Sequence, residues 1–159
     1  ALDIGSRIGE EWKSERIPTF EEILALCKGK IGIYLDLKAA PVAELMPIIK
    51  QFDMERDIIW YANGRALEEV MAVSDTAIPM PDPGAERALT RLIERFQPTI
   101  IAATWRNYSE TFVTTCHEAG AIVIVDESDP DCWPDAVAWG SDGIQTDHPE
   151  ALIAFLQAR

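Results

Sequence analysis

Basic residues are scarce in this 159-residue sequence, and their shortage limits its possible partners. It has 14 Lys and Arg against 27 Asp and Glu, which gives a formal net charge of −13 at pH 7. Nucleic acids and anionic membranes are bound through clustered Lys and Arg. We therefore expect no nucleic-acid partner, and the excess of carboxylates is compatible with binding of a divalent cation.

Cysteine pairs and long apolar runs are missing as well. The three cysteines, Cys27, Cys116 and Cys132, have no CxxC spacing and cannot all form disulfides. Reduced thiols indicate a reducing compartment, so we expect a cytoplasmic protein. No apolar run approaches the roughly 18 residues of a membrane-spanning helix, so no integral membrane segment is predicted.

The usual features of a chain start are also missing. The first residue is Ala1, and residues 2–6 have neither the basic nor the apolar region of a signal peptide. We interpret the sequence as part of a longer chain, so that any localisation signal would lie outside it.

What the sequence does contain is a regular alternation of short apolar runs and amphipathic stretches of helical period. The runs start roughly 22 residues apart, about the length of one βα unit with short loops. Their continuous hydrophobicity indicates strands buried on both faces, as in parallel sheets. The six predicted strands are 31–37, 57–62, 76–80, 99–103, 121–125 and 142–145. No linker interrupts the series, so residues 1–159 are expected to form a single domain.

Helix boundaries are marked between these strands. Thr19 and Glu22 have the capping-box pattern of a helix start, and Gly29 suits the end of that helix. Pro47 within 41–52 predicts either a kink or a late helix start. Pro149 suits the first turn of the last helix. That helix is expected to bury its apolar side chains, Leu152, Ile153, Phe155 and Leu156.

Six βα units are compatible with a doubly wound open sheet or with most of a (β/α)₈ barrel. The sequence has neither a G-x-G-x-x-G after its first strand nor a P-loop, which are the usual nucleotide-binding features of an open sheet. Polar or aromatic residues follow every apolar run, and in a barrel these strand ends meet at one mouth. We therefore favour the barrel. The strand-end residues are Asp36, Lys38, Tyr61, Asn63, Asp82, Trp105, Arg106, Asp126, Glu127 and 146–148.

Four segments then form a recognisable series. They are Leu2-Asp3-Ile4-Gly5-Ser6, Glu15-Arg16-Ile17-Pro18-Thr19-Phe20-Glu21-Glu22, Ile33-Tyr34-Leu35-Asp36-Leu37-Lys38 and Gly140-Ser141-Asp142-Gly143-Ile144-Gln145-Thr146-Asp147-His148-Pro149. In order and spacing, and over essentially the whole chain, they resemble successive landmarks of the glycerophosphodiester phosphodiesterase family. The second and fourth segments are fairly specific together, whereas either alone would be weak.

The resemblance implies a (β/α)₈ TIM-type barrel of which this chain supplies about six βα units and lacks the first two. It implies a metal-dependent phosphodiesterase of lipid and glycerol metabolism, which hydrolyses glycerophosphodiesters to glycerol 3-phosphate and an alcohol. The divalent ion, Ca²⁺ or Mg²⁺, is held in this family by carboxylates at strand ends, and two histidines near the first two strands act as general acid and base. The cation neutralises an anionic diester, and imidazoles transfer protons near neutral pH.

The resemblance also assigns residues. Asp36 stands where the family usually has a metal-binding Glu, and Lys38 corresponds to its companion Lys, a catalytic and phosphate-binding residue. Two residues apart at a strand end, both are expected to face the mouth, and a solvated ion pair is the alternative. Tyr61, Trp105 and His148 are candidate substrate contacts. The alternatives are packing for the two aromatic residues and a plain helix start for His148.

Several departures limit what this stretch does by itself. The family's His-Arg-Gly, Glu-x-Asp and His-Asp motifs have no counterpart here and are expected upstream of Ala1, and neither His117 nor His148 replaces the catalytic histidines. The family's Trp-Thr-Val-Asn is replaced by Ile-Val-Asp-Glu at 124–127. We expect residues 1–159 alone to be inactive, and to self-associate because six strands leave two open edges.

Two other functions are compatible with the residues. One is a non-catalytic binding module derived from a barrel. The other is a different phosphoester-binding barrel, which would need a glycine loop that grips phosphate after the seventh strand. Asp126 and Glu127 occupy that position and would repel phosphate, so this last reading is the least favoured.

Overall fold

The computed structural model describes residues 2–159, and each predicted strand is present. The strands are β1 (Ile33–Asp36), β2 (Ile58–Tyr61), β3 (Ile78–Pro79), β4 (Ile100–Thr104), β5 (Ile122–Asp126) and β6 (Gly143–Gln145). The helices are α1 (Gly5–Ile8), α2 (Phe20–Cys27), α3 (Val42–Gln51), α4 (Gly64–Val73), α5 (Leu89–Phe96), α6 (Glu110–Glu118), α7 (Trp133–Ala138) and α8 (Pro149–Gln157). Short 3-10 turns are η1 (Glu10–Trp12), η2 (Glu86–Ala88), η3 (Trp105–Asn107) and η4 (Pro130–Cys132).

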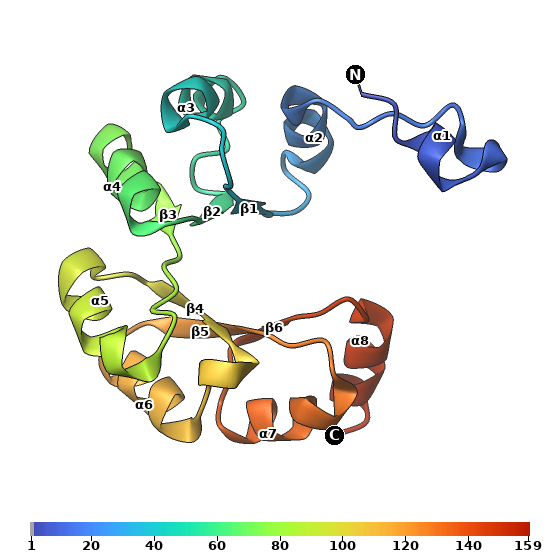
Figure 1. Ribbon diagram of the computed structural model, residues 1–159. Helices are drawn as coiled ribbons and strands as arrows, with labels where there is room; N and C mark the ends of the chain where they lie inside the picture. The colour runs from blue at the N-terminus through green and yellow to red at the C-terminus, as the bar shows by residue number, and fades with distance from the viewer. Residues whose placement is uncertain (1) are drawn as a thin grey trace.

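The strands form two parallel three-stranded sheets whose order follows the chain, β1-β2-β3 and β4-β5-β6. Figure 1 shows the strands on the inner side of an arc, with the helices outside and the arc open between β1 and β6. A doubly wound sheet reverses its strand order at a switch point and carries helices on both faces. The observed order has no reversal, so the open-sheet alternative is wrong.

Three alternate prolines separate the two sheets. The N–H of Met80 donates to the Trp60 carbonyl at 2.8 Å, so the backbone of Met80 faces β2. Because successive residues of an extended segment face opposite sides, Pro79 and Pro81 face β4, and Pro83 follows in the loop. Proline has no N–H to donate. Within residues 2–159, one backbone hydrogen bond joins this stretch to β4, from the Ala102 N–H to the Pro81 carbonyl at 3.0 Å.

The main hydrophobic core lies between the strands and the outer helices. Trp60 is fully buried in it, so this aromatic residue packs in the core. Its indole Nε1 has no hydrogen-bond partner among the described residues. A smaller cluster of Met80, Ile100 and Ala102 lies apart from the main core, with Tyr61 packed against it.

The helix signals are mostly confirmed. Thr19 accepts from the Glu22 N–H at 3.2 Å, and the Glu22 carboxylate accepts from the Thr19 N–H at 2.7 Å, which completes the capping box. Pro47 lies inside α3, which begins at Val42, so a late helix start is wrong. Leu152 of α8 is buried, but Ile153 and Leu156 are 54% and 47% exposed, because α8 lies at the open end of the arc.

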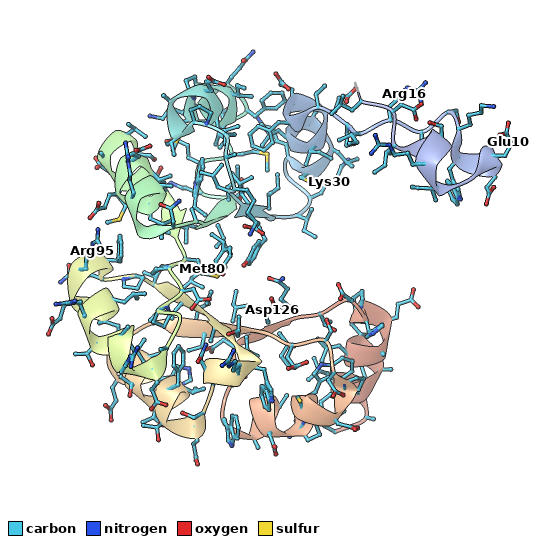
Figure 2. All side chains as sticks on the ribbon, in the orientation of Figure 1. Glu10, Arg16, Lys30, Met80, Arg95 and Asp126 are labelled. Atoms are coloured by element: carbon cyan, nitrogen blue, oxygen red, sulfur yellow. The ribbon has the colours of Figure 1, made fainter. Side chains whose placement is uncertain are left out.

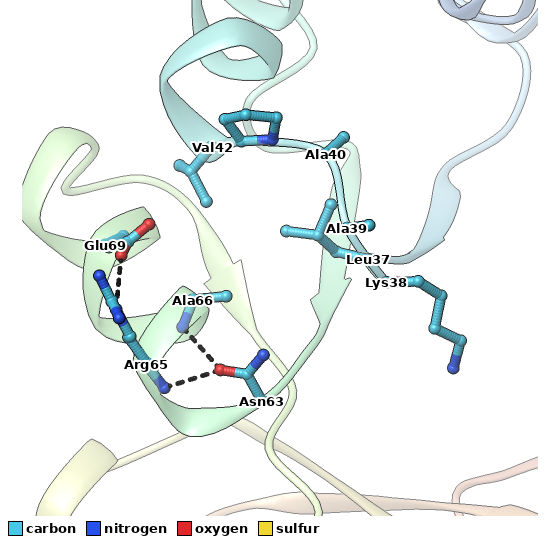
Figure 3. A pocket seen from close by; sticks show the side chains of 10 residues that line it. Leu37, Lys38, Ala39, Ala40, Val42, Asn63, Arg65, Ala66 and Glu69 are labelled. Carbon is cyan, nitrogen blue, oxygen red and sulfur yellow. Dashed lines mark hydrogen bonds and ion pairs between the residues drawn. The ribbon is translucent and has the colours of Figure 1, made fainter.

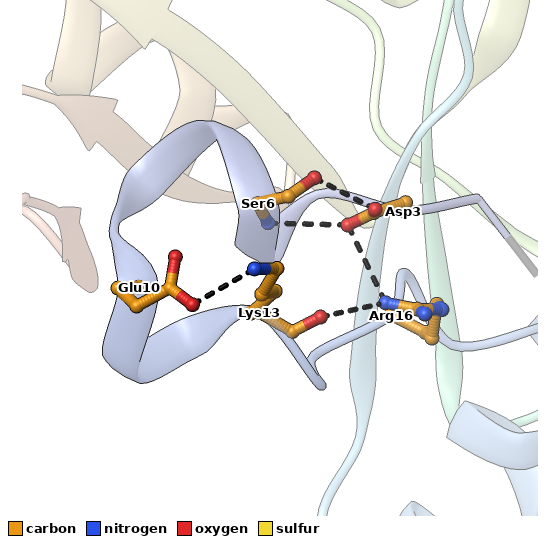
Figure 4. A network of polar contacts seen from close by, with 5 residues as sticks. All are labelled: Asp3, Ser6, Glu10, Lys13 and Arg16. Carbon is orange, nitrogen blue, oxygen red and sulfur yellow. Dashed lines mark hydrogen bonds and ion pairs between the residues drawn. The ribbon is translucent and has the colours of Figure 1, made fainter.

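The first motif, around α1, has a structural explanation. A Cβ on Gly5 would lie 1.5 Å from the Trp12 carbonyl oxygen, so no larger residue fits there. Asp3 accepts hydrogen bonds from the Ser6 hydroxyl at 2.7 Å and the Ser6 N–H at 3.2 Å, and it pairs with Arg16 at 3.4 Å (Figure 4). These hydrogen bonds from Ser6 lower the pKa of the exposed Asp3 carboxyl. The segment extends away from the strands beyond α2 (Figure 1).

All three cysteines are free thiols. None of the helices in residues 2–159 combines the length and the apolar content that crossing a bilayer requires.

Candidate active site

A cavity of about 150 Å³ lies at the carboxyl ends of the strands and is lined from both sheets. Its walls come from every strand or from the loop that follows it. In a parallel α/β fold, the carboxyl ends of the strands are where binding and catalytic residues gather. The lining residues are Tyr34, Asp36, Lys38, Tyr61, Asp82, Ala102, Ala103, Thr104, Ile124, Asp126 and Gln145.

Strand alternation places the β1 residues in this cavity. Tyr34, Asp36 and Lys38 are spaced two apart and line it together, whereas Ile33 and Leu35 pack against the main core. Asp36 and Lys38 therefore line one cavity, and this arrangement is compatible both with a metal and phosphate site and with a solvated ion pair. Their side chains form an ion pair, with Lys38 Nζ 2.8 Å from Asp36 Oδ1 and the Lys38 side chain 75% exposed.

Tyr61 lies beside this ion pair, because it is the register partner of Asp36 on β2. Lys38 Nζ is 5.8 Å from the Tyr61 ring centroid. The ring centroids of Tyr34 and Tyr61 are 5.7 Å apart. The Tyr61 hydroxyl donates to Asp82 Oδ2 at 3.2 Å, and the Gly84 N–H donates to Asp82 Oδ1 at 2.6 Å. Asp82 therefore fixes both the Tyr61 hydroxyl and the loop after β3.

The cavity is acidic. It contains three carboxylates, from Asp36, Asp82 and Asp126, and one cation, Lys38. Burial, followed by the charges of Asp147, Glu127 and Asp82, raises the pKa of Asp126. Burial also raises the pKa of Tyr61, with Asp82 adding to the shift, so this phenol stays protonated and donates its hydrogen bond. Figure 2 shows Asp126 on the concave side of the arc.

The described residues do not fit a complete divalent-metal site. No group of three or more His, Cys, Asp and Glu side chains in residues 2–159 is placed to hold a metal ion. Magnesium and calcium need several oxygen ligands. Asp36 is one such oxygen donor, and one of its oxygens already pairs with Lys38.

The other predicted site residues lie elsewhere. Trp105 stacks on Trp139, with ring centroids 5.2 Å apart and planes 8° apart, and it does not line the cavity. His148 precedes α8 and lines a separate cavity of about 420 Å³ with Asp147 and 149–151. The structure therefore brings together Asp36, Lys38 and Tyr61, and leaves Trp105 and His148 outside this group.

His117 lies at the opposite ends of the strands. Its Nε2 is 2.9 Å from Asp142 Oδ2, and the same oxygen accepts the Val123 N–H at 2.8 Å. Asp142 immediately precedes β6 and Val123 is near the start of β5. This pair is therefore part of the base of the structure and is remote from the cavity.

A shallower cavity of about 220 Å³ adjoins the site, between the loop after β1 and the start of α4. Asn63 Oδ1 accepts the N–H groups of Arg65 and Ala66 at 3.1 Å each, and Arg65 pairs with Glu69 at 3.2 Å. Figure 3 shows these bonds, with Lys38 extending away from α4. Lys38 thus lines both cavities, and its side chain points away from the α4 wall of the shallower one.

Sequence reasoning did not place Tyr34, Thr104 or Gln145 at the site. Their signal was available in part, since Tyr34 shares the strand face of Asp36 by simple alternation. Thr104 and Gln145 required the register between neighbouring strands, in which Thr104 pairs with Asp126 and Asp126 with Gln145.

Comparison with known proteins places the fold. No family model and no curated protein matches the sequence. Among solved structures, a glycerophosphodiester phosphodiesterase from Agrobacterium tumefaciens is 17% identical to this chain, with a TM-score of 0.77. The match covers 91% of this chain and 64% of the chain in that structure. One from Parabacteroides distasonis is 20% identical with a TM-score of 0.76, over 91% and 66%. A provisionally assigned member from Galdieria sulphuraria is 17% identical with a TM-score of 0.80, over 91% and 65%.

The chain thus spans just under two thirds of the length of these structures. At such low identity the likeness establishes the fold, which is the α/β fold that they share. It agrees with the resemblance drawn from the four sequence segments.

Proposed function

We propose that this chain is the carboxyl-terminal part of a glycerophosphodiester phosphodiesterase, a phosphoric diester hydrolase that releases glycerol 3-phosphate and an alcohol. The observation that carries the proposal is the position of Asp36 and Lys38 in one cavity at the carboxyl ends of the strands. The fold shared with solved phosphodiesterases supports it. The proposal includes Tyr61 as a wall of the substrate site and leaves out Trp105 and His148, which do not line this cavity.

Lys38 supplies the only positive charge in the cavity lining. Its ammonium group has three donors, and one is directed to Asp36 at 2.8 Å. The remaining donors are available to the non-bridging oxygens of a phosphodiester. The neighbouring Tyr61 ring restricts where the ammonium can move, and it contributes a cation–π contact.

A divalent cation, Ca²⁺ or Mg²⁺, belongs to this proposal, with Asp36 as one ligand and the other ligands outside residues 2–159. Its contribution would be to neutralise the diester oxygens in a cavity that is otherwise acidic. Chelation of the full-length protein with EDTA should abolish hydrolysis, and either ion should restore it. Full activity in EDTA would remove the cation from the proposal.

We further propose that two more βα units complete a (β/α)₈ barrel. Within the described chain β1 pairs only with β2, and β6 only with β5, and a closed barrel of this kind needs eight strands. Residues 1–159 alone are then inactive and self-associate through the open edges. Light scattering of this stretch should report oligomers, whereas a stable, active monomer would contradict barrel closure by further units.

A cytoplasmic location, suggested by the free thiols, is part of the same proposal.

The direct test is hydrolysis of a panel of glycerophosphodiesters by the full-length protein, with glycerol 3-phosphate as the measured product. Lys38→Ala should lower kcat/KM by about 10²- to 10³-fold, because a charge that contacts the transferring group is lost. Lys28→Ala is the matched control, since Lys28 forms an exposed ion pair with Asp53 at 3.1 Å, far from the cavity. Equal activity of the two variants would refute the role of Lys38.

A non-catalytic binding module is the second candidate. It is favoured by the lack of a three-ligand metal group in residues 2–159 and by the distance of His117 from the cavity. The same assay decides between the two, because a binding module retains glycerophosphodiesters without releasing glycerol 3-phosphate.

A further inference from the structure

A second cavity, of about 270 Å³, lies between α4 and α5 on the outer side of the proline stretch. It shares only Asp82 with the candidate active site. Its floor is apolar, with Leu67, Leu92 and Phe96 buried, and its rim carries two arginines, Arg91 and Arg95. The remaining lining residues are Ala62, Asn63, Gly64, Pro81, Pro83 and Ala88.

The two rim arginines differ in their partners. Arg95 is tied to Glu68 of α4, with its Nη2 2.6 Å and its Nε 3.0 Å from Glu68 Oε1. Arg91 has no ion-pair or hydrogen-bond partner in the part of the chain that the structure describes. Asp82, the one carboxylate in the lining, is already engaged by Tyr61 and Gly84. Arg91, an exposed residue, is thus an unpaired cation among the residues that line this cavity.

Gly64, the first residue of α4, lines the cavity. A Cβ at Gly64 would lie 3.5 Å from Phe96 Cζ and 3.6 Å from Arg95 Nη1, so it would fit but would start to fill the space. In residues 2–159, one backbone hydrogen bond joins the proline stretch to β4, and the Arg95–Glu68 ion pair links α5 to α4 beside the cavity. A molecule in this cavity would touch both helices.

We propose that the cavity binds a small amphipathic carboxylate. Its oxyanion pairs with Arg91, because guanidinium groups bind carboxylates through two parallel hydrogen bonds. Its apolar part lies on Leu67, Leu92 and Phe96. The volume is just below the usual range for ligand sites and suits a molecule of benzoate size. Asp82 at the rim favours a monoanion over a phosphate dianion. This site is independent of the proposed hydrolysis.

The test is calorimetric titration of the full-length protein with sodium benzoate. We expect saturable binding of one equivalent and a rise in the thermal midpoint, because the ligand bridges α4 and α5. Benzyl alcohol and phenyl phosphate should each bind at least about tenfold more weakly, since the first lacks the charge and the second carries more of it. Tighter binding of phenyl phosphate would overturn the carboxylate assignment. The absence of saturable binding at millimolar benzoate would overturn the site.

Variants locate the bound molecule. Arg91→Ala should weaken benzoate binding at least about tenfold. Arg87→Ala is the matched control, because Arg87 is exposed nearby on η2 and does not line the cavity. Gly64→Val should abolish binding while keeping or raising the thermal midpoint, because the added side chain fills the space. If the Gly64→Val variant does not fold, benzoate binding is measured with Gly64→Ala instead. Unchanged binding in Arg91→Ala, or equal losses in Arg91→Ala and Arg87→Ala, would overturn the proposal.

Discussion

The two halves of the arc differ in how firmly their backbones are joined. In the first half, α2–α4 with β1–β3, the strands β2 and β3 pair through two register positions. In the second half, α5–α8 with β4–β6, the strands β4 and β5 pair through five. The first half also supplies Lys38, the one cation among the residues that line the cavity, and its neighbours Asp36 and Tyr61. Asp36 and Tyr61 are register partners on β1 and β2, which pair through four positions, so the candidate chemistry lies beside the short β2–β3 ladder and not on it.

The two halves also differ in the side chains that pack in their interiors. The first half packs aliphatic residues such as Leu24, Ile49 and Leu67, all fully buried. The second half packs aromatic rings on one another, in the series Trp139, Trp105, Tyr108 and Phe112. It also has polar ties, in which the Tyr108 hydroxyl bonds to Ser141 and Ser141 donates to the Ala136 carbonyl at 2.7 Å. These ties join Tyr108, after η3, to α7 and to the residues that precede β6, all within the second half.

The largest expected effect comes from removing one core side chain in each half. Ile49→Ala and Phe112→Ala both truncate a fully buried residue, and should cost about 2–5 and about 3–5 kcal/mol. Because few backbone bonds cross the proline stretch, each variant should lose hydrogen-exchange protection mainly in its own half. Ile49→Val is the milder control, at about 0.5–1.5 kcal/mol. Equal loss of protection in both halves would mean that the proline stretch does not divide the fold.

A smaller effect is expected from giving the proline stretch a donor. Pro81→Ala supplies an N–H that faces β4, where the Pro81 carbonyl already accepts from Ala102. The new hydrogen bond contributes about 0.5–1.5 kcal/mol, and the lost proline rigidity costs about 0.4–1 kcal/mol. Global stability should therefore change by less than about 1 kcal/mol, while the amide of Ala102 exchanges more slowly.

Met80→Ala distinguishes this effect from side-chain packing. It leaves all three prolines in place and removes a fully buried side chain where the two sheets meet. It should cost about 2–5 kcal/mol without slowing exchange at Ala102. Unchanged exchange at Ala102 in Pro81→Ala would indicate that the prolines are not what separates the sheets.

The sequence predicted the strands well because parallel strands are buried on both faces. Runs such as 99–103 and 121–125 are continuously apolar, and β4 and β5 overlap them closely. Helix starts were predictable where one side chain closes the first turn, as Thr19 does. These features depend on neighbours a few residues away, so local sequence carries them.

The features that sequence reasoning missed depend on which neighbour lies beside a residue. The division into two sheets at Pro79 and Pro81 was missed, because the side that these prolines face depends on Met80, whose N–H donates to β2. Trp105 follows a strand end as expected, yet it turns outward onto Trp139, because that ring offers a stacking partner. The sequence placed Asp36 and Lys38 in the cavity correctly because alternation within one strand was sufficient.

The smallest expected effect concerns the carboxylate that the second half adds to the cavity. Burial, then Asp147, Glu127 and Asp82, raises the pKa of Asp126 above its ordinary value of 3.8. A raised folded-state pKa means that ionised Asp126 destabilises the fold at neutral pH, and that this cost disappears as the pH falls through its pKa. Asp126→Asn should therefore stabilise the protein at pH 7, by less than about 0.5 kcal/mol, because the residue is largely exposed, so that its burial is slight and its charge is screened by solvent.

Urea unfolding at pH 7 and near pH 4 measures this difference, which should shrink toward zero at the lower pH. Asp131→Asn is the matched control, because it removes a carboxylate of the neighbouring loop that does not line the cavity. A stabilisation by Asp126→Asn that persists unchanged at low pH would trace the effect to packing. Loss of the effect at low pH would instead place the cost in the ionised carboxylate, so that the second half would lower stability electrostatically at the cavity, to which the first half contributes the cation Lys38.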